Sequence, residues 1–243
     1  MKQVWRLIPL LTAAGNVHMA VDKWLLEQHQ SGKHPPCLRF YTWWPAAISL
    51  GYHQRQYPEF WRNLTWQGQK LDLVQRPTGG RAVLHQGDLT YAVITSGLTG
   101  TRLQAYAKIC EFLIQGWRSL GVELDYGTAG RGYIHNPNCF GTATGADLVT
   151  ADGCKLIGSA QLRRGEAILQ HGSMRLQPDA DLFRQVFNTE SFHPVQLPQN
   201  LNQEIIINAL IAAACECFDI QLKLQPLTEG EWQAIMTGIS ESD

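Results

Sequence analysis

The sequence has few charged residues and no long hydrophobic run. Charged residues make up 17% of its 243 residues, against roughly 25% in an average globular protein. Twenty basic residues balance 21 acidic ones, which excludes a strongly basic nucleic-acid-binding protein and any bulk attraction to a membrane surface. The longest apolar run beyond the start, residues 205–215, is too short to cross a bilayer. Because 44% of the residues are hydrophobic, the chain can bury a substantial core, and disorder is excluded.

Several short motifs of common chemistries are also missing. The sequence has no GxxxxGKS/T or GxGxxG motif for phosphate, no HExxH and no GxSxG. Its six cysteines include no CxxC pair, which argues against structural zinc, and their irregular spacing favours reduced thiols. Residues 7–15 loosely resemble a signal peptide, but Pro9 interrupts them. We therefore expect a cytoplasmic protein with no metal, nucleic-acid or membrane partner.

The hydrophobic pattern predicts a single mixed α+β domain over residues 1–243, with residues 199–243 as a C-terminal appendage of helix and strand. We expect one helix capped by Asn16 and ending near Gly32, and another at 103–120 that Gly121 terminates. Further helical spacing occurs at 57–64, 179–187 and 202–217, and Thr228 and Glu231 have capping-box spacing before a last helix. Strands are predicted at residues 4–8, 38–43, 47–50, 71–75, 82–85, 89–95, 122–126, 147–150, 155–160, 168–176 and 220–224.

A set of chemically active residues lies at the ends of these strands. Gly79 and Gly80 allow close approach to a carbonyl, carboxylate or phosphate, although a tight turn explains them equally well. Lys155 begins a strand of apolar and small residues, where a lone lysine is usually an edge or solvent residue. Cys139 lies in a long irregular stretch, residues 127–144, and a free cysteine is most often a small buried hydrophobe. The other members of the set are Arg76, Thr78, Arg81, His85, Gly158, Ser159, Ala160 and His171.

The order of these motifs resembles the biotin/lipoate protein ligase catalytic-domain family. The matching segments are MAVD (19–22), RFYTW (39–43), SLGYHQ (49–54), RPTGGRAVLH (76–85), LTY (89–91), KLIGSAQ (155–161) and LQHGS (169–173). The resemblance extends from about Trp5 to Leu176. It implies an α+β fold in which a mixed, mostly antiparallel sheet is flanked by helices and encloses a bifurcated tunnel. It also implies that the Gly79–Gly80 loop and Lys155 border a bound acyl group.

Within the family, the chain is most similar to the LipM-type octanoyltransferases. These enzymes move an octanoyl group from acyl carrier protein to a lysine of a lipoyl domain, typically in the glycine-cleavage H protein. The pair Cys139–Phe140 matches their pattern, in which that cysteine accepts the acyl group. Lipoate ligases carry an Arg-Asn-Asp run here, and biotin ligases carry a GRGRxGR run that this chain lacks. Lys23 and residues 142–146 depart from the transferase pattern, which puts the substrate preference in question.

The residues permit acyl transfer without a cofactor. A thioester already carries the activation that a free carboxylate must obtain from ATP, so Cys139 can accept an octanoyl group by thiol exchange. Lys155 is the first candidate for taking the proton of the acceptor lysine or holding the acyl carbonyl, with His85 and His171 as alternatives. The amides of the glycine pair are expected to stabilise the oxyanion.

Other residues have weaker claims to the site. Cys154 is the competing thiol, but alternation along a strand points it away from Lys155. Four aromatic residues are candidate lining for the tunnel, although ordinary core packing is expected for at least two of them: Tyr41, Trp43, Trp44 and Tyr52.

Two other functions stay open from sequence. One is an ATP-dependent lipoate–protein ligase catalytic domain, which would use ATP and magnesium. The other is a noncatalytic protein that binds lipoyl domains, against which the intact Cys139, Lys155 and glycine loop argue. The acceptor protein, the oligomeric state, the choice between octanoyl and lipoyl groups and the identity of the base are not specified by the sequence.

Overall fold

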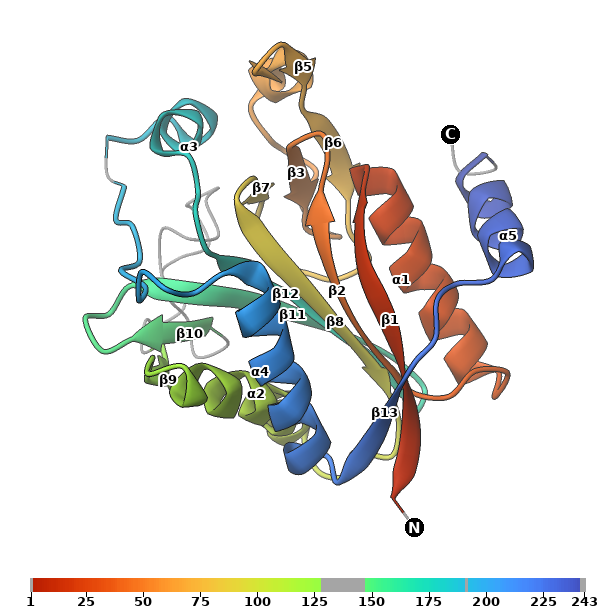
Figure 1. The fold of residues 1–243 in the computed structure, drawn as a ribbon. Helices are drawn as coiled ribbons and strands as arrows, with labels where there is room; N and C mark the ends of the chain where they lie inside the picture. Colours follow the sequence, from red (N-terminus) through yellow and green to blue (C-terminus); the bar gives the residue numbers. More distant parts are fainter. Residues whose placement is uncertain (1, 128–146, 191, 241–243) are drawn as a thin grey trace.

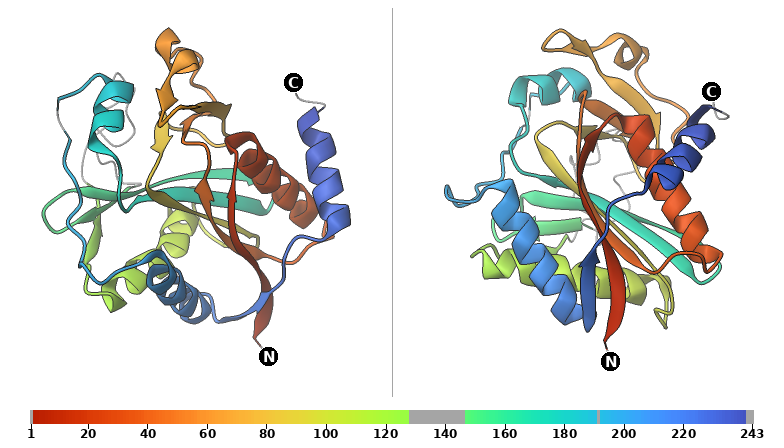
Figure 2. Two further views of the ribbon diagram at one scale, coloured as in Figure 1. Left: turned by 45° about the horizontal axis from the view of Figure 1, so that its top comes forward. Right: turned by 45° about the vertical axis from the view of Figure 1, so that its right-hand side comes forward.

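One large β-sheet crosses the molecule, with helices on both faces and a small sheet at one end (Figures 1 and 2). The structure is a computed structural model that describes residues 2–127, 147–190 and 192–240. Its helices are α1 (Gly15–Gln30), η1, a 3-10 helix (Glu59–Asn63), α2 (Arg102–Ser119), α3 (Ala180–Phe187), α4 (Gln203–Cys217) and α5 (Glu229–Ser240). Its strands are β1 (Gln3–Ala13), β2 (Cys37–Trp43), β3 (Ala47–Leu50), β4 (Thr65–Trp66), β5 (Gln69–Lys70), β6 (Asp72–Gln75), β7 (Val83–His85), β8 (Asp88–Thr95), β9 (Leu124–Tyr126), β10 (Asp147–Thr150), β11 (Lys155–Arg164), β12 (Ala167–Arg175) and β13 (Ile220–Leu224).

The large sheet is mixed and mostly antiparallel. Its strand order is β13-β1-β2-β8-β12-β11-β10-β9, and only the pairs β13/β1 and β1/β2 are parallel. The other five pairs are antiparallel. The expected fold class is therefore confirmed.

Alternation along the strands supplies an apolar surface to each face of this sheet. In β2, Leu38 and Phe40 pack with α2 and α4, whereas Cys37 and Tyr41 pack with α1. Helix α5 in turn packs on α1. Both faces are thus covered, and the strands in the middle of the sheet are buried along their whole length, as the run of buried residues in β8 shows.

The small sheet has the order β6-β3-β7 and stands above the face that α1 covers (Figures 1 and 2). Strand β3 pairs in parallel with β6 and antiparallel with β7. Successive side chains of β3 point to opposite sides, so Ser49 faces the large sheet while Leu50 belongs to a separate apolar cluster. The small sheet therefore forms a roof over part of the large one.

Two expectations for the N-terminal segment are wrong. The first strand is longer than predicted, because a register shift between Ile8 and Leu11 accommodates Pro9. Asn16 does not cap α1, which begins at Gly15; the Gly15 amide donates to Asp72 Oδ2 at 2.8 Å instead. A distant carboxylate thus replaces the local cap.

Other helix boundaries follow local signals. Gly121, with φ of +79°, follows the end of α2 as predicted. The start of α2 is a capping box between Thr101 and Gln104. Thr228 and Glu231 form the predicted capping box, since the Glu231 amide donates to Thr228 Oγ1 at 3.3 Å. In the described part of the chain, no helix combines the length and apolar character needed to span a bilayer.

Candidate active site

A narrow cavity lies between the large sheet and the small one. Strands β2, β8, β11 and β12 contribute to one side, and β3, β7 and the loop after β6 contribute to the other. Thr78, Arg81 and Lys155 are not among its lining residues, although Thr78 and Arg81 are hydrogen-bonded to residues that are. The cavity brings together eight of the predicted site residues: Arg76, Gly79, Gly80, His85, Gly158, Ser159, Ala160 and His171.

Lys155 is buried at the start of β11, not at an edge or in solvent. Its Nζ lies 2.8 Å from Oδ1 of Asp147 on the neighbouring strand β10, and both side chains are buried. The Cε and Nζ atoms lie 2.9 and 3.1 Å from the position that a Cβ would occupy at Gly158. Gly158 lines the cavity, and its missing side chain leaves room for the lysine amine directly beside this lining residue.

Arg76 holds the glycine loop in place. Its guanidinium donates to the carbonyl oxygens of Gly79 at 2.9 Å and Arg81 at 2.7 Å, and to that of Ser49 at 2.8 Å. Gly80 adopts φ of +97°, which disfavours any side chain. On the other side, Gly51 packs so closely that a Cβ there would overlap the Gly80 carbonyl. The loop is therefore fixed from both sides.

A buried carboxylate and histidine connect α1 to the residue before the glycine pair. Asp22 Oδ2 accepts from His171 Nδ1 at 2.9 Å, and His171 Nε2 is hydrogen-bonded to Thr78 Oγ1 at 2.6 Å. Burial opposes ionisation of Asp22, but the nearby guanidinium of Arg39 and the bond from His171 together hold its pKa below the usual value. Asp22 is thus a fixed anion that orients His171 on the cavity wall.

His85, at the end of β7 in the small sheet, is also held between an aspartate and a hydroxyl group. Its Nδ1 donates to Asp88 Oδ2 at 2.8 Å, and its Nε2 is hydrogen-bonded to Ser49 Oγ at 2.8 Å. Burial lowers the pKa of His85 despite the adjacent Asp88, so the ring is neutral near pH 7 and its Nε2 accepts from the serine hydroxyl. Trp43 stacks on this ring with centroids 3.8 Å apart.

The far end of the cavity from Lys155 is apolar and aromatic. Met19 from α1 and Tyr41 and Trp43 from β2 line it, and β2 is separated from β11 by β8 and β12. Trp44 and Tyr52 do not line this cavity and are 57% and 51% exposed.

Three of the described thiols are poor nucleophiles. Burial raises the pKa of Cys37 and of Cys110 to about 12, and burial with the nearby Asp152 raises the pKa of Cys154. Because only the thiolate is nucleophilic, these three are weak acyl acceptors at neutral pH. Cys139, the predicted acceptor, lies outside the described residues.

Several residues of this site were not singled out from the sequence. Asp147 contacts Lys155, and Asp88 and Ser49 contact His85, from neighbouring strands. Asp147 had a usable signal, since it is the sole acid of a predicted strand that pairs with the strand of Lys155. Within the described ranges, no group of three or more histidine, cysteine or carboxylate side chains is arranged to hold a metal.

Comparison with known sequences identifies relatives of this arrangement. Residues 15–210 match the lipoyl protein ligase A/B catalytic domain. The octanoyltransferase LipM of Anoxybacillus flavithermus is 35% identical to this chain over 95% of the chain and 92% of its own length. The octanoyltransferase LipM of Carboxydothermus hydrogenoformans is 39% identical over 75% of this chain and 69% of its own.

Solved structures share the fold. A bipartite lipoate protein ligase from Thermoplasma acidophilum has a TM-score of 0.77 at 22% identity, covering 98% of this chain and 93% of its own. Lipoate-protein ligase A bound with ATP has a TM-score of 0.76 at 23% identity, covering 99% and 95%. At these identities the likeness establishes the fold alone. The family match and the relatives at 35% identity and above show that this chain belongs to the lipoyl protein ligase A/B catalytic-domain family.

Proposed function

We infer that this chain transfers an octanoyl group from acyl carrier protein to a lysine of a lipoyl-domain protein, in the cytoplasm, as a step of lipoate biosynthesis. The observation that carries this function is the buried Lys155–Asp147 pair beside the cavity that also contains the Gly79–Gly80 loop. The curated octanoyltransferases at 35% and 39% identity support the reaction type.

The first step is a thioester exchange at Cys139. Its thiolate attacks the carbonyl of the octanoyl thioester, the new carbon–sulfur bond forms, and the carrier thiol leaves and takes up a proton. One thioester replaces another, so this step needs no nucleotide. In this proposal the amides of Gly79 and Gly80 stabilise the oxyanion, because the loop is held rigidly by Arg76 and needs no rearrangement.

The second step is aminolysis. The acceptor lysine arrives as an ammonium ion, so it must lose one proton before it attacks the thioester. When the amide bond forms, the amine loses its second proton and the departing thiolate of Cys139 gains one. In this proposal Lys155, held by Asp147, polarises the acyl carbonyl, and His85 or His171 relays the first proton toward solvent.

The acyl chain lies across the sheet in this proposal. Its carbonyl is near Gly158 on β11 and its tail points toward Met19, Tyr41 and Trp43. The intervening strands give about 14 Å between β11 and β2, at roughly 4.8 Å per strand. A chain of eight carbons fits within that span. Burial of its methylenes stabilises the complex by about 0.8 kcal/mol each.

Intact-mass spectrometry tests the mechanism. Incubation with octanoyl carrier protein is expected to add one octanoyl group to the enzyme, and Cys139→Ser is expected to abolish this hydroxylamine-sensitive adduct. Cys154→Ser, at a thiol with a raised pKa, is the matched control and keeps it. Product formation only with ATP and free octanoate would establish the ligase reaction instead, and binding of the lipoyl-domain protein with neither adduct nor product would establish a noncatalytic binder.

A further inference from the structure

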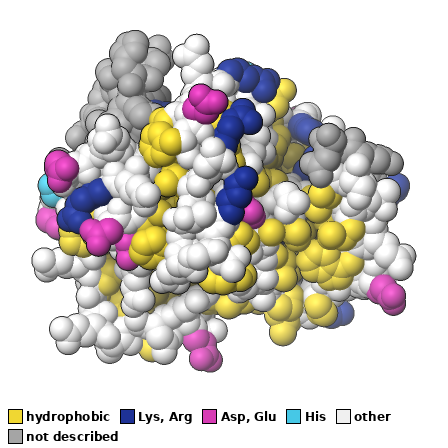
Figure 3. Space-filling view, turned by 90° about the horizontal axis from the view of Figure 1, so that it is seen from above, with side chains coloured by type: hydrophobic (Ala, Val, Ile, Leu, Met, Phe, Trp, Pro, Cys, Tyr) yellow, Lys and Arg dark blue, Asp and Glu magenta, His cyan; other side chains and the backbone are white. Residues whose placement is uncertain are grey.

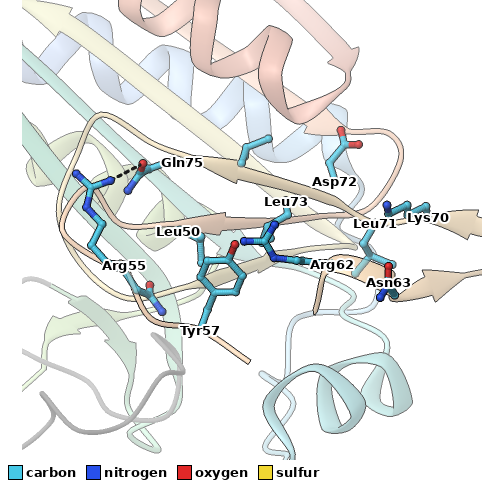
Figure 4. A pocket seen from close by; sticks show the side chains of 12 residues that line it. Leu50, Arg55, Tyr57, Arg62, Asn63, Lys70, Leu71, Asp72, Leu73 and Gln75 are labelled. Atoms are coloured by element: carbon cyan, nitrogen blue, oxygen red, sulfur yellow. Dashed lines mark hydrogen bonds between the residues drawn. The ribbon is translucent and has the colours of Figure 1, made fainter. Parts of the chain in front are cut away.

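A second pocket lies against the small sheet (Figure 4). It has a volume of about 870 Å³ and is formed by the loop after β3, by η1 and by residues 70–75. Leu50 lines this pocket, whereas its neighbour Ser49 lines the acyl cavity. One strand, β3, therefore separates the two sites.

Three exposed cations line this pocket: Arg55, Arg62 and Lys70. None of them forms an ion pair within the described residues. Arg55 donates to the amide oxygen of Gln75 at 3.4 Å, and the Arg62 guanidinium lies 5.3 Å from the Tyr57 ring centroid (Figure 4). The pocket thus concentrates positive charge that the fold does not neutralise.

The nearby acidic side chains do not neutralise these three cations. Asp72 is the one carboxylate in the lining, and its Oδ2 accepts from the Gly15 amide at 2.8 Å, on the side of α1 (Figure 4). Glu59 lies on η1 but is not part of the lining. By contrast, Lys108 on α2 pairs with Glu111 at 2.6 Å. Lys and Arg side chains gather over the middle of this end of the molecule when it is viewed from above (Figure 3).

A series of hydrogen bonds connects the positive pocket to the glycine loop. Gln75 receives the hydrogen bond from Arg55, and its amide nitrogen donates to the Tyr52 carbonyl at 3.0 Å. The Tyr52 amide donates to the Thr78 carbonyl at 2.8 Å, directly before the glycine pair. A molecule bound at Arg55 would therefore lie close to the loop at which the acyl group reacts.

We propose that Arg55, Arg62 and Lys70 form the docking surface for the acidic protein that donates the octanoyl group, an acyl carrier protein. The assignment rests on the proposed function, in which such a protein is the donor. The acyl chain of that donor hangs from a phosphopantetheine arm, whose attachment to the protein is an anionic phosphodiester. Arginine pairs well with both phosphate oxygens and carboxylates. Opposite charge at this surface orients the donor before its arm enters the acyl cavity.

The test measures binding separately from turnover. Fluorescence anisotropy of labelled octanoyl carrier protein is titrated with the full-length enzyme and with R55E/R62E/K70E. The control is K33E/R102E/K223E, which reverses three exposed cations elsewhere and changes the net charge equally. We expect the pocket variant to bind at least about tenfold more weakly and the control to stay within about twofold, because contact electrostatics is local at physiological salt.

Turnover of two donors provides a second readout. The ratio of kcat/KM for octanoyl carrier protein to kcat/KM for octanoyl-pantetheine, which has neither protein nor phosphate, is expected to fall about tenfold in the pocket variant. Equal losses with both donors would overturn the docking role, as would equal losses of binding in the two triple variants or tight carrier binding by R55E/R62E/K70E.

Failure of the proposed function is distinguishable from failure of this inference. A wild-type enzyme that binds the carrier through the pocket without transferring octanoate would overturn the function and keep the docking surface. A wild-type enzyme that does not bind the carrier would overturn the docking surface. If charge reversal impairs folding, R55Q/R62Q/K70Q and the salt dependence of wild-type binding decide the matter, since docking through these cations predicts weaker binding as salt rises.

Discussion

Lys155 forms a buried ion pair with Asp147, with Nζ 2.8 Å from Oδ1, across the strands β11 and β10. Gly158 on the same strand leaves the space that the lysine side chain occupies. The pair fixes the amine next to Gly158, which lines the cavity between the two sheets. It also places a carboxylate, which no motif identified, in contact with a predicted catalytic residue.

Asp147→Asn is expected to reduce both stability and octanoyl transfer. Removing one partner leaves the buried ammonium uncompensated, which costs roughly 3–5 kcal/mol. Urea unfolding measures the loss of stability, and the rate of octanoyl transfer to a lipoyl-domain protein measures the loss of function. The exposed pair Lys108–Glu111 supplies the control, because Glu111→Gln should cost less than about 1 kcal/mol.

The double variant K155M/D147L separates the structural role of this pair from its chemical role. Replacing both charges with apolar side chains removes the unpaired charge, so stability should recover relative to D147N. Transfer activity should not recover. A fully active K155M/D147L enzyme would rule out any contribution of Lys155 to the reaction.

Gly51→Ala is expected to displace the glycine loop. The new Cβ would overlap the Gly80 carbonyl, and overpacking of this kind costs about 1–3 kcal/mol. We expect a lower melting temperature together with slower transfer. Gly230→Ala in α5 is the control, because nothing lies within 4 Å of its Cβ and alanine favours helix. Unchanged activity in Gly51→Ala would show that the loop position is not critical.

The lowered pKa of His18 predicts that the protein loses stability in mild acid. Burial and the neighbouring Arg39 lower its pKa from 6.5 to about 3. Between these pH values the unfolded chain binds a proton that the folded protein does not, so stability is complete above pH 6.5 and falls as the pH decreases toward 3. The loss reaches at most about 1.4 kcal/mol per pH unit.

Urea titrations at pH 7.5 and pH 5 measure this loss. Glutamine can donate to the Thr42 carbonyl and accept from Arg39, as His18 does. His18→Gln should therefore weaken the pH dependence while preserving the fold. An identical slope in wild type and variant would assign the acid sensitivity to other groups, such as His85, whose pKa is also lowered.

Glu231 predicts a second loss at lower pH. Hydrogen bonds from Arg6, at 2.7 and 2.8 Å, lower its pKa from 4.5 to about 2. The ionised form stabilises the folded protein above pH 4.5, and this contribution disappears as the pH falls toward 2. At neutral pH the free energy of unfolding of the wild type should be higher than that of Glu231→Gln by roughly 1–3 kcal/mol.

In urea titrations, the difference in free energy of unfolding between wild type and Glu231→Gln should become smaller as the pH falls from 7 to 3.5. Thr228→Ala is a useful companion, because it removes the cap of α5 but leaves the ion pair. A gap between wild type and Glu231→Gln that does not change with pH would mean that the carboxylate charge is not what anchors α5 to β1.

Local pattern was sufficient for most elements of the fold. Strand periodicity placed β2 and β8 within a residue or two of their bounds, and Gly121 marked the end of α2. The prediction that Asn16 caps α1 was wrong because the Gly15 amide donates to Asp72, which comes from a strand distant in the sequence. Such a contact depends on tertiary structure and leaves no mark in the neighbouring sequence.

The site residues also divide into those that sequence motifs indicated and those that only tertiary contacts reveal. The motif resemblance indicated the family, which is confirmed. It implied that the glycine loop and Lys155 border an acyl group, with His85 and His171 as alternative bases, and the structure brings the loop and both histidines to one cavity. Asp22 was visible only as part of a motif, since its bond to His171 joins residues 149 positions apart. Cys139 remains a prediction, because it lies outside the described residues.

The pairing of β1 with β13 also constrains the order of folding. Gln3 lies beside Ile220 in the sheet, so β1 leaves the ribosome more than two hundred residues before the strand that becomes its outer neighbour. Until then that edge has unsatisfied amides and carbonyls, which favour association with other nascent chains. Shielding by a chaperone during synthesis would matter most for this strand.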